Sequence, residues 1–181
     1  MKLPLYQVDA FTSRLFCGNP AAVVILNDWL SDDVLQAISA ENNLSETAFV
    51  IPRPDIAPLR WFTPTVEVDL CGHATLATAH VLFRYYFPSL DTVQFSTRSG
   101  LLSVSRNHEF LRMDFPAAPG AAVEVTKSLI SALGAKPREV LFSGRLMAVL
   151  ESEGEVSGLR PDFGLIASLD AHGVIVTAPG D

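Results

Sequence analysis

The chain has 181 residues, of which 49% are hydrophobic and 18% are charged, and its formal net charge at pH 7 is −7. This composition supplies enough apolar material for one large or two small hydrophobic cores and excludes an intrinsically disordered chain. The acidic balance, without any run of lysine or arginine, argues against a protein that binds nucleic acid non-specifically, since such proteins need a basic surface.

Signals for export and membrane insertion are missing from the sequence. The opening residues, MKLPLYQVDAF, lack the apolar core of a signal peptide, and no stretch approaches the roughly 18 uninterrupted apolar residues of a membrane-spanning helix. Two cysteines, Cys17 and Cys71, are too few for a disulfide framework. We therefore expect a cytoplasmic protein that does not associate with membranes.

Up to residue 70, the pattern predicts strands with one amphipathic helix among them. Continuous or alternating apolar residues indicate strands at 3–10, 21–26, 48–51, 59–62 and 66–70. Ser31 is a typical helix N-cap and precedes two aspartates, which favour the positive end of the helix dipole. The helix that follows should end near Asn42-Asn43, so that residues 44–47 form a short connection.

The segment from Gly72 to Phe87 differs from an ordinary surface helix. Its apolar residues leave no clean polar face over most of its length, and a helix that is apolar on nearly all sides is buried on nearly all sides. It is too short, and too interrupted by histidine and arginine, to span a membrane. We therefore expect a central helix over about 73–86 that is enclosed by strands, with His80 packed in the core.

Beyond this helix the sequence predicts more strands and then a second, smaller region. Strands are indicated at 92–98, 101–106, 109–115, 146–150 and 174–176, and a helix at 125–133. Proline and glycine crowd into 116–120, which is typical of a linker. The fold class is therefore α+β, with an N-terminal lobe at 1–116 and a partial second lobe at 117–181. With about 60 residues, the second region is near the lower size limit for an independent core.

Cys71-Gly72-His73 lies at the start of the predicted buried helix. The N–H groups and the positive dipole end of a helix start bind anions, and a glycine there permits close approach. These residues predict a site for a substrate carboxylate, although Gly72 also fits a simple tight turn. The same field should lower the pKa of Cys71, and His73 could hydrogen-bond a substrate, orient a base or be structural.

Glu46 lies in the predicted connection between the first helix and the next strand, beside Ser45 and Thr47. A partly buried carboxylate there would act as a general base, because desolvation raises its pKa toward the working pH. The alternative is a solvated surface acid, which is the usual state of a loop glutamate. We interpret Glu67 and Asp69 as solvated surface acids. The sequence shows no metal-ligand spacing, phosphate-binding loop or internal repeat.

Four short motifs occur together in a fixed order along the chain. They are Gly18-Asn19-Pro20-Ala21-Ala22-Val23, Asn43-Leu44-Ser45-Glu46-Thr47-Ala48-Phe49, Arg60-Trp61-Phe62-Thr63-Pro64 and Glu67-Val68-Asp69-Leu70-Cys71-Gly72-His73-Ala74-Thr75. In order and spacing they resemble the phenazine-biosynthesis PhzF-like family. The resemblance covers roughly residues 5–120 closely and the remainder more loosely.

This resemblance implies a fold and a chemistry. The fold would be that of diaminopimelate epimerase, with two similar lobes, each a β-barrel-like sheet around a central helix. The active site would lie between the lobes and use no cofactor and no metal. Family members isomerise a substrate by moving a proton, and the glutamate of their Ser-Glu-Thr motif, here Glu46, is the acid–base residue. Gly72 and His73 match the groups that hold the substrate, and Asn19 lines the same cleft. Ser45 and Cys71 would be secondary residues of this active site.

The resemblance also leaves alternatives open. Family members continue past a stretch like 177–180 into a second-lobe motif, whereas this chain stops at Asp181. A non-catalytic remnant that only binds a carboxylate is therefore one alternative. A thiol-based racemase using Cys71 is another, but it needs a second thiol, and no cysteine follows position 71. The expected partner is a small carboxylate-bearing metabolite, and an incomplete lobe would expose apolar edges that favour a homodimer.

Overall fold

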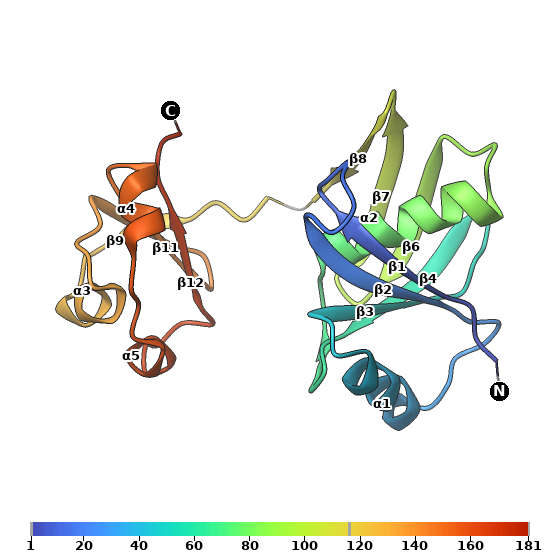
Figure 1. Cartoon of the computed structure of the whole chain (residues 1–181), viewed down its shortest axis with the longest axis horizontal. Coiled ribbons are helices and arrows are strands. Elements are labelled where there is room, and N and C mark those ends of the chain that lie inside the picture. The colour runs from blue at the N-terminus through green and yellow to red at the C-terminus, as the bar shows by residue number, and fades with distance from the viewer. Residues whose placement is uncertain (1, 116, 181) are drawn as a thin grey trace. The chain divides into compact units, whose positions relative to one another are not determined.

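The structure is a computed structural model of the chain, and it describes residues 2–115 and 117–180. The chain divides into two compact units, Met1–Phe115 and Pro116–Asp181, here called the first and the second unit (Figure 1). The division falls at the start of the predicted linker at 116–120, of which residue 116 lies outside the described residues. Among the described residues, no helix combines the length and the apolar character needed to cross a membrane.

The first unit is a curled sheet wrapped around one helix (Figure 1). Its strands follow the order β1-β2-β3-β4-β6-β7-β8, with β5 paired to β4. They span Leu5–Ala10 (β1), Asn19–Ile25 (β2), Glu46–Val50 (β3), Ile56–Phe62 (β4), Glu67–Val68 (β5), Thr92–Thr97 (β6), Gly100–Asn107 (β7) and Phe110–Asp114 (β8). The enclosed helix is α2 (Gly72–Val81), which continues as a π-helical turn, Leu82–Tyr86. The α+β class and the central helix are confirmed.

Helix α2 is buried because its side chains are small or apolar on nearly every side. Ala74, Ala77 and Ala79 are at most 1% exposed, and they pack in one cluster with Trp61 and Phe95 from the surrounding strands. Alanine lets a helix approach a sheet closely and has the best helix propensity. Each large side chain buried in this cluster contributes roughly 1.5–3 kcal/mol to the hydrophobic stabilisation.

The outer face of the sheet is covered by helix α1 (Asp32–Asn42), as Figure 1 shows. Successive residues of a strand point to opposite faces. In β3, Ala48 and Val50 therefore face α2, whereas Phe49 joins Leu35 of α1 in a second apolar cluster. Helix α1 ends at the predicted place, because Asn43 adopts the left-handed conformation, with a φ of 51°.

Two predictions about where single residues lie in the elements of this unit are wrong. Glu46 is not in a loop but is the first residue of β3, so the strand begins before the predicted residue 48. His80 is not in the core, since its side chain is exposed. The sheet is open, with β1 and β8 as its two edges, and it therefore does not enclose every position of α2.

The second unit is a smaller sheet of four strands in the order β12-β11-β10-β9. Its strands and helices are β9 (Ala121–Val123), α3 (Lys127–Leu133), β10 (Glu139–Phe142), β11 (Leu146–Val149), α4 (Glu153–Gly158), α5 (Phe163–Ala167) and β12 (Val174–Thr177). Helix α3 begins as Thr126 accepts a hydrogen bond from the N–H of Leu129, and it ends at Gly134 with a φ of 72°. Leu129 and Leu133 of α3 pack on Val140 of the sheet.

The connectivity of the second unit repeats that of the first. Strands β1 and β2 pair antiparallel, and β2 then pairs parallel with β3 after the helix α1. Strands β10 and β11 also pair antiparallel, and β11 pairs parallel with β12 after α4 and α5. The chain thus contains a structural repeat that has no counterpart in the sequence pattern.

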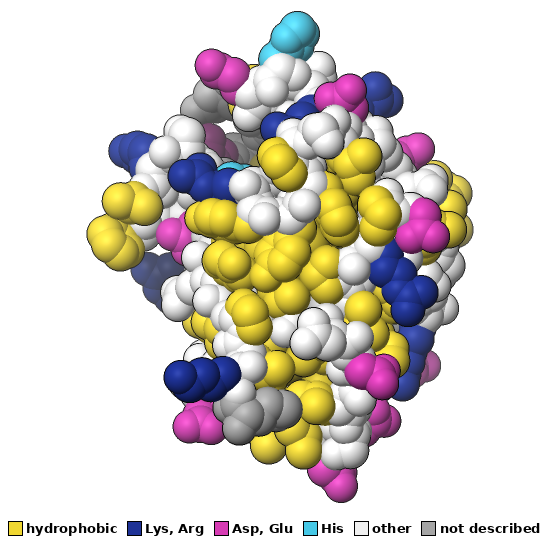
Figure 2. All heavy atoms as spheres, turned by 90° about the vertical axis from the view of Figure 1, so that its right-hand side faces the viewer, with side chains coloured by type: hydrophobic (Ala, Val, Ile, Leu, Met, Phe, Trp, Pro, Cys, Tyr) yellow, Lys and Arg dark blue, Asp and Glu magenta, His cyan; other side chains and the backbone are white. Residues whose placement is uncertain are grey.

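Large hydrophobic side chains remain exposed on the first unit. Among them are Phe11, Phe16 and Tyr85, which are 69%, 95% and 54% exposed. Figure 2 shows hydrophobic side chains gathered over the centre of the face that it displays. Continuous apolar surface of this kind favours association, so self-association stays a prediction that the oligomeric state in solution would test.

Candidate active site

The parallel strands β2 and β3 begin side by side, next to the start of α2. Ala21 of β2 pairs with Glu46, the first residue of β3. Because strand residues alternate between faces, Glu46 lies on the same face as Ala48, which packs on α2. By the same alternation Asn19 shares the face of Ala21. Both predicted polar side chains therefore belong to the inner face of the sheet.

His73, in the first turn of α2, connects the groups of the site. Its Nε2 atom lies 3.4 Å from Oε2 of Glu46 and 3.4 Å from Oγ of Ser45. Its Nδ1 atom lies 3.4 Å from Sγ of Cys71. The side chain of His73 is 9% exposed and that of Glu46 is 22% exposed. Partners on both nitrogens fix the orientation of the ring, while the carboxylate stays accessible to a small molecule.

The first turn of α2 is held from within and covered from outside. The hydroxyl of Thr75 donates a hydrogen bond to the carbonyl oxygen of Cys71 at 2.6 Å. A Cβ atom on Gly72 would lie 3.1 Å from Cζ of Phe115 and 3.8 Å from Cε of Met113. A side chain at position 72 would therefore require the ring of Phe115 to shift by a few tenths of an ångström, and the tight-turn interpretation and the anion-binding one are compatible.

The predicted lowering of the Cys71 pKa is wrong. The pKa of Cys71 is raised to about 12, mainly by burial of the thiol, which leaves the residue 6% exposed, and the nearby Glu46 carboxylate acts in the same direction. The backbone N–H groups of Ala74 and His73 act in the opposite direction. Desolvation of the thiolate thus exceeds the stabilisation by the helix start. At neutral pH Cys71 is a neutral thiol.

The residues of the site combine three kinds of donor atom. Glu46, Cys71 and His73 each offer one atom to a group whose members lie within 4.8 Å of one another. The sequence showed no metal-ligand spacing for this group, because Glu46 belongs to β3 while the other two flank the start of α2. A metal-binding motif is visible in a sequence mainly when its ligands share one element or one loop.

Comparison with known proteins gives the family of the chain. The model of the phenazine biosynthesis-like protein family, PhzC-PhzF, matches residues 8–180. The chain belongs to this family. An uncharacterized isomerase of Pseudomonas aeruginosa is 52% identical over 181 residues, which span 99% of this chain and 69% of the relative. A human phenazine biosynthesis-like domain-containing protein is 46% identical over 145 residues, 74% of this chain and 50% of the relative.

Solved structures agree with the family and the fold. A PhzF-family protein of Enterococcus faecalis has a TM-score of 0.93 and 46% identity, with 100% of this chain and 70% of that chain covered. A predicted epimerase of Pseudomonas aeruginosa has a TM-score of 0.75 at 22% identity, covering 97% of this chain and 70% of that chain. At that identity the likeness concerns the fold alone. The diaminopimelate epimerase-like fold expected from the motifs is confirmed at this level.

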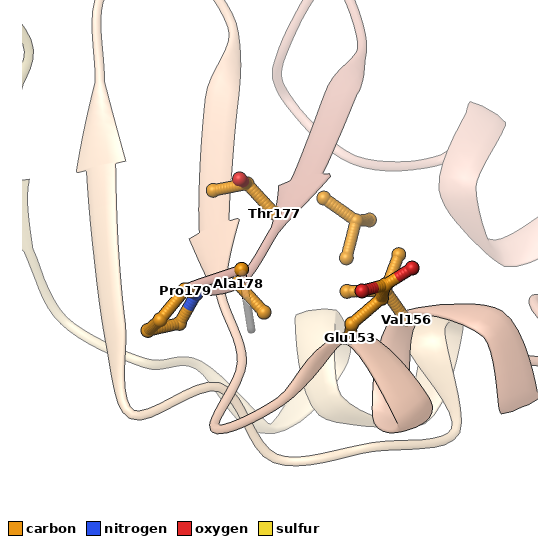
Figure 3. Close-up of a pocket in the computed structure, with 7 residues that line it drawn as sticks. Glu153, Val156, Thr177, Ala178 and Pro179 are labelled. Atoms are coloured by element: carbon orange, nitrogen blue, oxygen red, sulfur yellow. The ribbon is translucent and has the colours of Figure 1, made fainter.

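One cavity of the second unit has no comparable group of side chains among the described residues that line it. A hollow of about 270 Å³ lies beside the end of β12 (Figure 3). Among the described residues that line it, Glu153 is the one ionisable side chain, and the others include Val156, Ala178 and Pro179. A single carboxylate among apolar groups provides no base with a partner. Because Glu46, Cys71 and His73 lie together there, the start of α2 is the candidate site of this PhzF-family chain.

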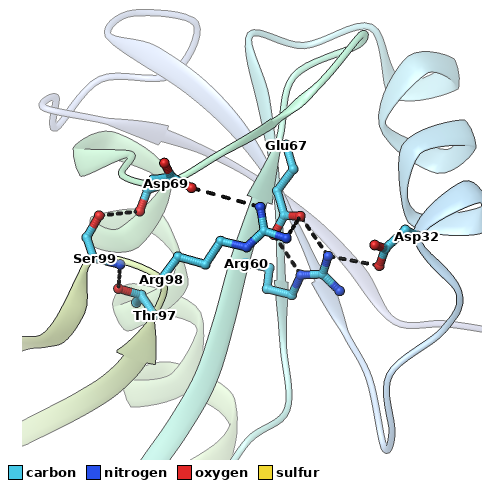
Figure 4. Close-up of polar contacts among 7 residues, drawn as sticks. All are labelled: Asp32, Arg60, Glu67, Asp69, Thr97, Arg98 and Ser99. Atoms are coloured by element: carbon cyan, nitrogen blue, oxygen red, sulfur yellow. Dashed lines mark hydrogen bonds and ion pairs between the residues drawn. The ribbon is translucent and has the colours of Figure 1, made fainter.

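Glu67 is not the solvated acid that the sequence indicated. Its side chain is 10% exposed, and its carboxylate lies 2.7 Å from Nη2 of Arg60 and 2.6 Å from Nη2 of Arg98 (Figure 4). Hydrogen bonds to Glu67 and then to Asp32 raise the pKa of Arg60 above its ordinary value, against the effect of burial. Asp69, in contrast, is 75% exposed, as predicted.

The ion pairs of Glu67 position the chain that leads into the site. Arg98 comes from the turn between β6 and β7, and Ser99 of the same turn donates a hydrogen bond to the carbonyl oxygen of Asp69 at 2.7 Å (Figure 4). Asp69 lies just ahead of Cys71 and α2. The turn between β6 and β7 thus fixes the connection from which the helix start projects.

Proposed function

We propose that this PhzF-family chain carries the acid–base half of an isomerase. The reaction is the movement of a proton on a small carboxylate-bearing metabolite, without a cofactor, with Glu46 as the acid–base residue. The observation that carries the proposal is the 3.4 Å separation between Oε2 of Glu46 and Nε2 of His73 at the start of α2. Membership of the family and the isomerase names of relatives in Pseudomonas aeruginosa support the class of reaction.

The start of α2 is the proposed binding place for the substrate carboxylate. The N–H groups of the first turn of a helix have no partner within the helix and carry its positive dipole end. Phe115 and Met113 lie on the side of Gly72 where a Cβ atom would be, and His73 supplies a polar side chain at the helix start. An anion held there has its charge balanced by the backbone, and Asn19 supplies a further hydrogen-bonding group on the same face.

The proposed proton transfer uses one base. Glu46 takes a proton from a carbon near the bound carboxylate, and the electron pair left on the substrate spreads into the adjacent unsaturated system. The protonated Glu46 then returns the proton to a different carbon, so the net reaction is an isomerisation. His73 and Ser45 orient the carboxyl group, and the field of the helix start stabilises the developing negative charge.

Cys71 has a different proposed role from the thiolate base of a racemase. Burial raises the pKa of Cys71 to about 12, and a protonated thiol is not a nucleophile or a base. A neutral thiol next to His73 contributes packing and a weak donor. The thiol-based alternative therefore has less support than catalysis by Glu46.

The experiment follows hydrogen exchange at carbon by NMR in D₂O, with a panel of small cyclic and aliphatic carboxylates and the full chain. We expect deuterium to enter one substrate, and we expect Glu46→Gln to slow this exchange by about 10²–10⁴-fold. Glu41→Gln is the matched control, because Glu41 lies exposed on α1 and should leave the rate unchanged. Exchange at the wild-type rate in Glu46→Gln would disprove the assignment.

A second outcome separates catalysis from binding. If carboxylates bind, as seen by changes in their NMR line width, but no carbon-bound hydrogen exchanges, the chain is a binding module in this form. Loss of exchange in Cys71→Ser with retention in Glu46→Gln would instead favour the thiol-based alternative.

A further inference from the structure

The start of α2 brings together a carboxylate, a thiol and an imidazole from two separate elements. Glu46, Cys71 and His73 each contribute one atom to a group within 4.8 Å. Cys71 is 6% exposed and the side chain of His73 is 9% exposed. Three different donors held in one largely buried place form a potential ligand set for a cation, which the proposed isomerisation does not require.

The separations of these atoms suit a tetrahedral ion. Zinc binds sulfur at about 2.3 Å and nitrogen or oxygen at about 2.0–2.2 Å, so that its ligand atoms lie roughly 3.3–3.7 Å apart. Oε2 of Glu46 and Nε2 of His73 already lie 3.4 Å apart. The widest separation in the group is at most 4.8 Å. Cys71 faces the other ring nitrogen of His73, Nδ1. Binding therefore requires the imidazole to turn so that one nitrogen meets the ion, and the ligand atoms to approach one another by about 1 Å.

The chemistry of the donors selects the kind of cation. Magnesium and calcium prefer oxygen ligands, whereas sulfur and imidazole nitrogen favour zinc and related ions. The positive end of α2 opposes a cation. This repulsion is offset because the bound ion displaces the proton of the Cys71 thiol into solvent, and the Glu46 carboxylate and the resulting Cys71 thiolate together balance the double positive charge.

We propose that Glu46, Cys71 and His73 form a three-ligand site for Zn²⁺ or a similar borderline-soft divalent cation. The fourth position faces the region where a small molecule would approach Glu46, and water or a carboxylate oxygen would fill it. Binding of the ion occupies the carboxylate that the proposed function assigns to proton transfer. Zn²⁺ is then an inhibitor of the isomerase, and this consequence alone rests on the proposed function.

The test uses Co²⁺ as a visible substitute for Zn²⁺ in the full, metal-free chain. We expect about one equivalent to bind, with intense absorption bands of tetrahedral Co²⁺ and a near-ultraviolet band from thiolate coordination, and we expect Zn²⁺ to displace it. Cys71→Ser should remove the thiolate band. His73→Asn and Glu46→Gln should each weaken binding at least about tenfold, as the loss of one of three ligands requires.

Matched controls distinguish this site from adventitious binding. Cys17→Ser changes the cysteine outside the proposed site, His80→Asn changes an exposed histidine of α2, and Glu41→Gln changes an exposed glutamate of α1. All three should bind Co²⁺ like the wild type, and circular dichroism should show every variant folded. Absence of a thiolate band in the wild type, or equal weakening in the controls, would overturn the proposal. Failure here leaves the exchange experiment on metal-free protein unaffected.

Discussion

At the scale of single residues, Gly18 and Gly100 share an unusual backbone conformation but differ in the space around them. Comparing them therefore separates the cost of backbone strain from the cost of a steric clash. Both adopt left-handed backbone conformations, with φ values of 91° and 97°. A Cβ atom on Gly18 would lie 2.3 Å from the carbonyl oxygen of Ala10, whereas a Cβ atom on Gly100 would meet nothing within 4 Å. Gly18 precedes Asn19, so its conformation directs the chain into β2 and the site.

We therefore predict that Gly18→Ala destabilises the protein more than Gly100→Ala does. Gly100→Ala should lower the free energy of unfolding by about 1–2 kcal/mol, the cost of a left-handed residue with a side chain. Gly18→Ala should cost about 2 kcal/mol more, because the backbone must also move. Urea denaturation monitored by circular dichroism measures both. Equal costs would show that the Ala10 carbonyl moves away freely.

The sequence predicted which residues meet at the site better than it predicted the burial and the protonation of single side chains. The motifs identified Glu46, Gly72 and His73 as neighbours, and the structure brings Glu46 and His73 together. The prediction from the sequence was wrong for the pKa of Cys71, because the burial of this residue depends on strands far away along the chain. The prediction that Glu67 is a solvated acid was wrong for the same reason, since Arg98, one of its partners, lies on a turn beyond α2.

At the scale of elements, the start of α2 depends on the ion pairs of Glu67. This carboxylate joins Arg60 of β4 to Arg98 of the turn between β6 and β7 (Figure 4). Two guanidinium groups share one largely buried carboxylate, so its removal leaves them facing each other. Breaking a buried pair by removing one partner costs more than the pair itself contributes.

We predict that Glu67→Gln lowers the free energy of unfolding by about 1–3 kcal/mol, which allows for the partial exposure of Arg98. Asp69→Asn is the matched control. Its carboxylate is 75% exposed and lies 3.9 Å from Arg98, so the change should cost less than about 0.5 kcal/mol. Thermal and urea unfolding provide the comparison. A Glu67→Gln protein as stable as Asp69→Asn would mean that solvent screens the cluster.

Elements with a strong periodic signal were predicted well, and the short ones were not. The central helix and the strands of the first unit follow from apolar patterns that tertiary contacts reinforce. Helices α4 and α5, of six and five residues, were missed, because a helix shorter than about 12 residues has little stability of its own and depends on capping and packing. Ser152 and Asp162 accept N-cap hydrogen bonds there, which is a signal that the sequence did contain.

At the scale of the whole molecule, the candidate site and its supporting contacts belong to one unit. Glu46, Cys71 and His73 all lie within Met1–Phe115. That unit has its own core around α2 and a second apolar cluster under α1. Its strands are joined by an uninterrupted series of pairings from β1 to β8. A unit that buries its own core and pairs its own strands meets the physical requirements for independent folding.

We therefore predict that residues 1–115, expressed alone, fold cooperatively and keep the site. Trp61 is 1% exposed, so its fluorescence should shift to longer wavelength in a single transition when urea unfolds the fragment. Co²⁺ should bind with an affinity within about threefold of the full chain, since all three proposed ligands are present. A fragment that lacks a cooperative transition would show that the second unit is needed for the fold. A folded fragment that binds Co²⁺ much more weakly would show that residues beyond 115 hold the ligands in place.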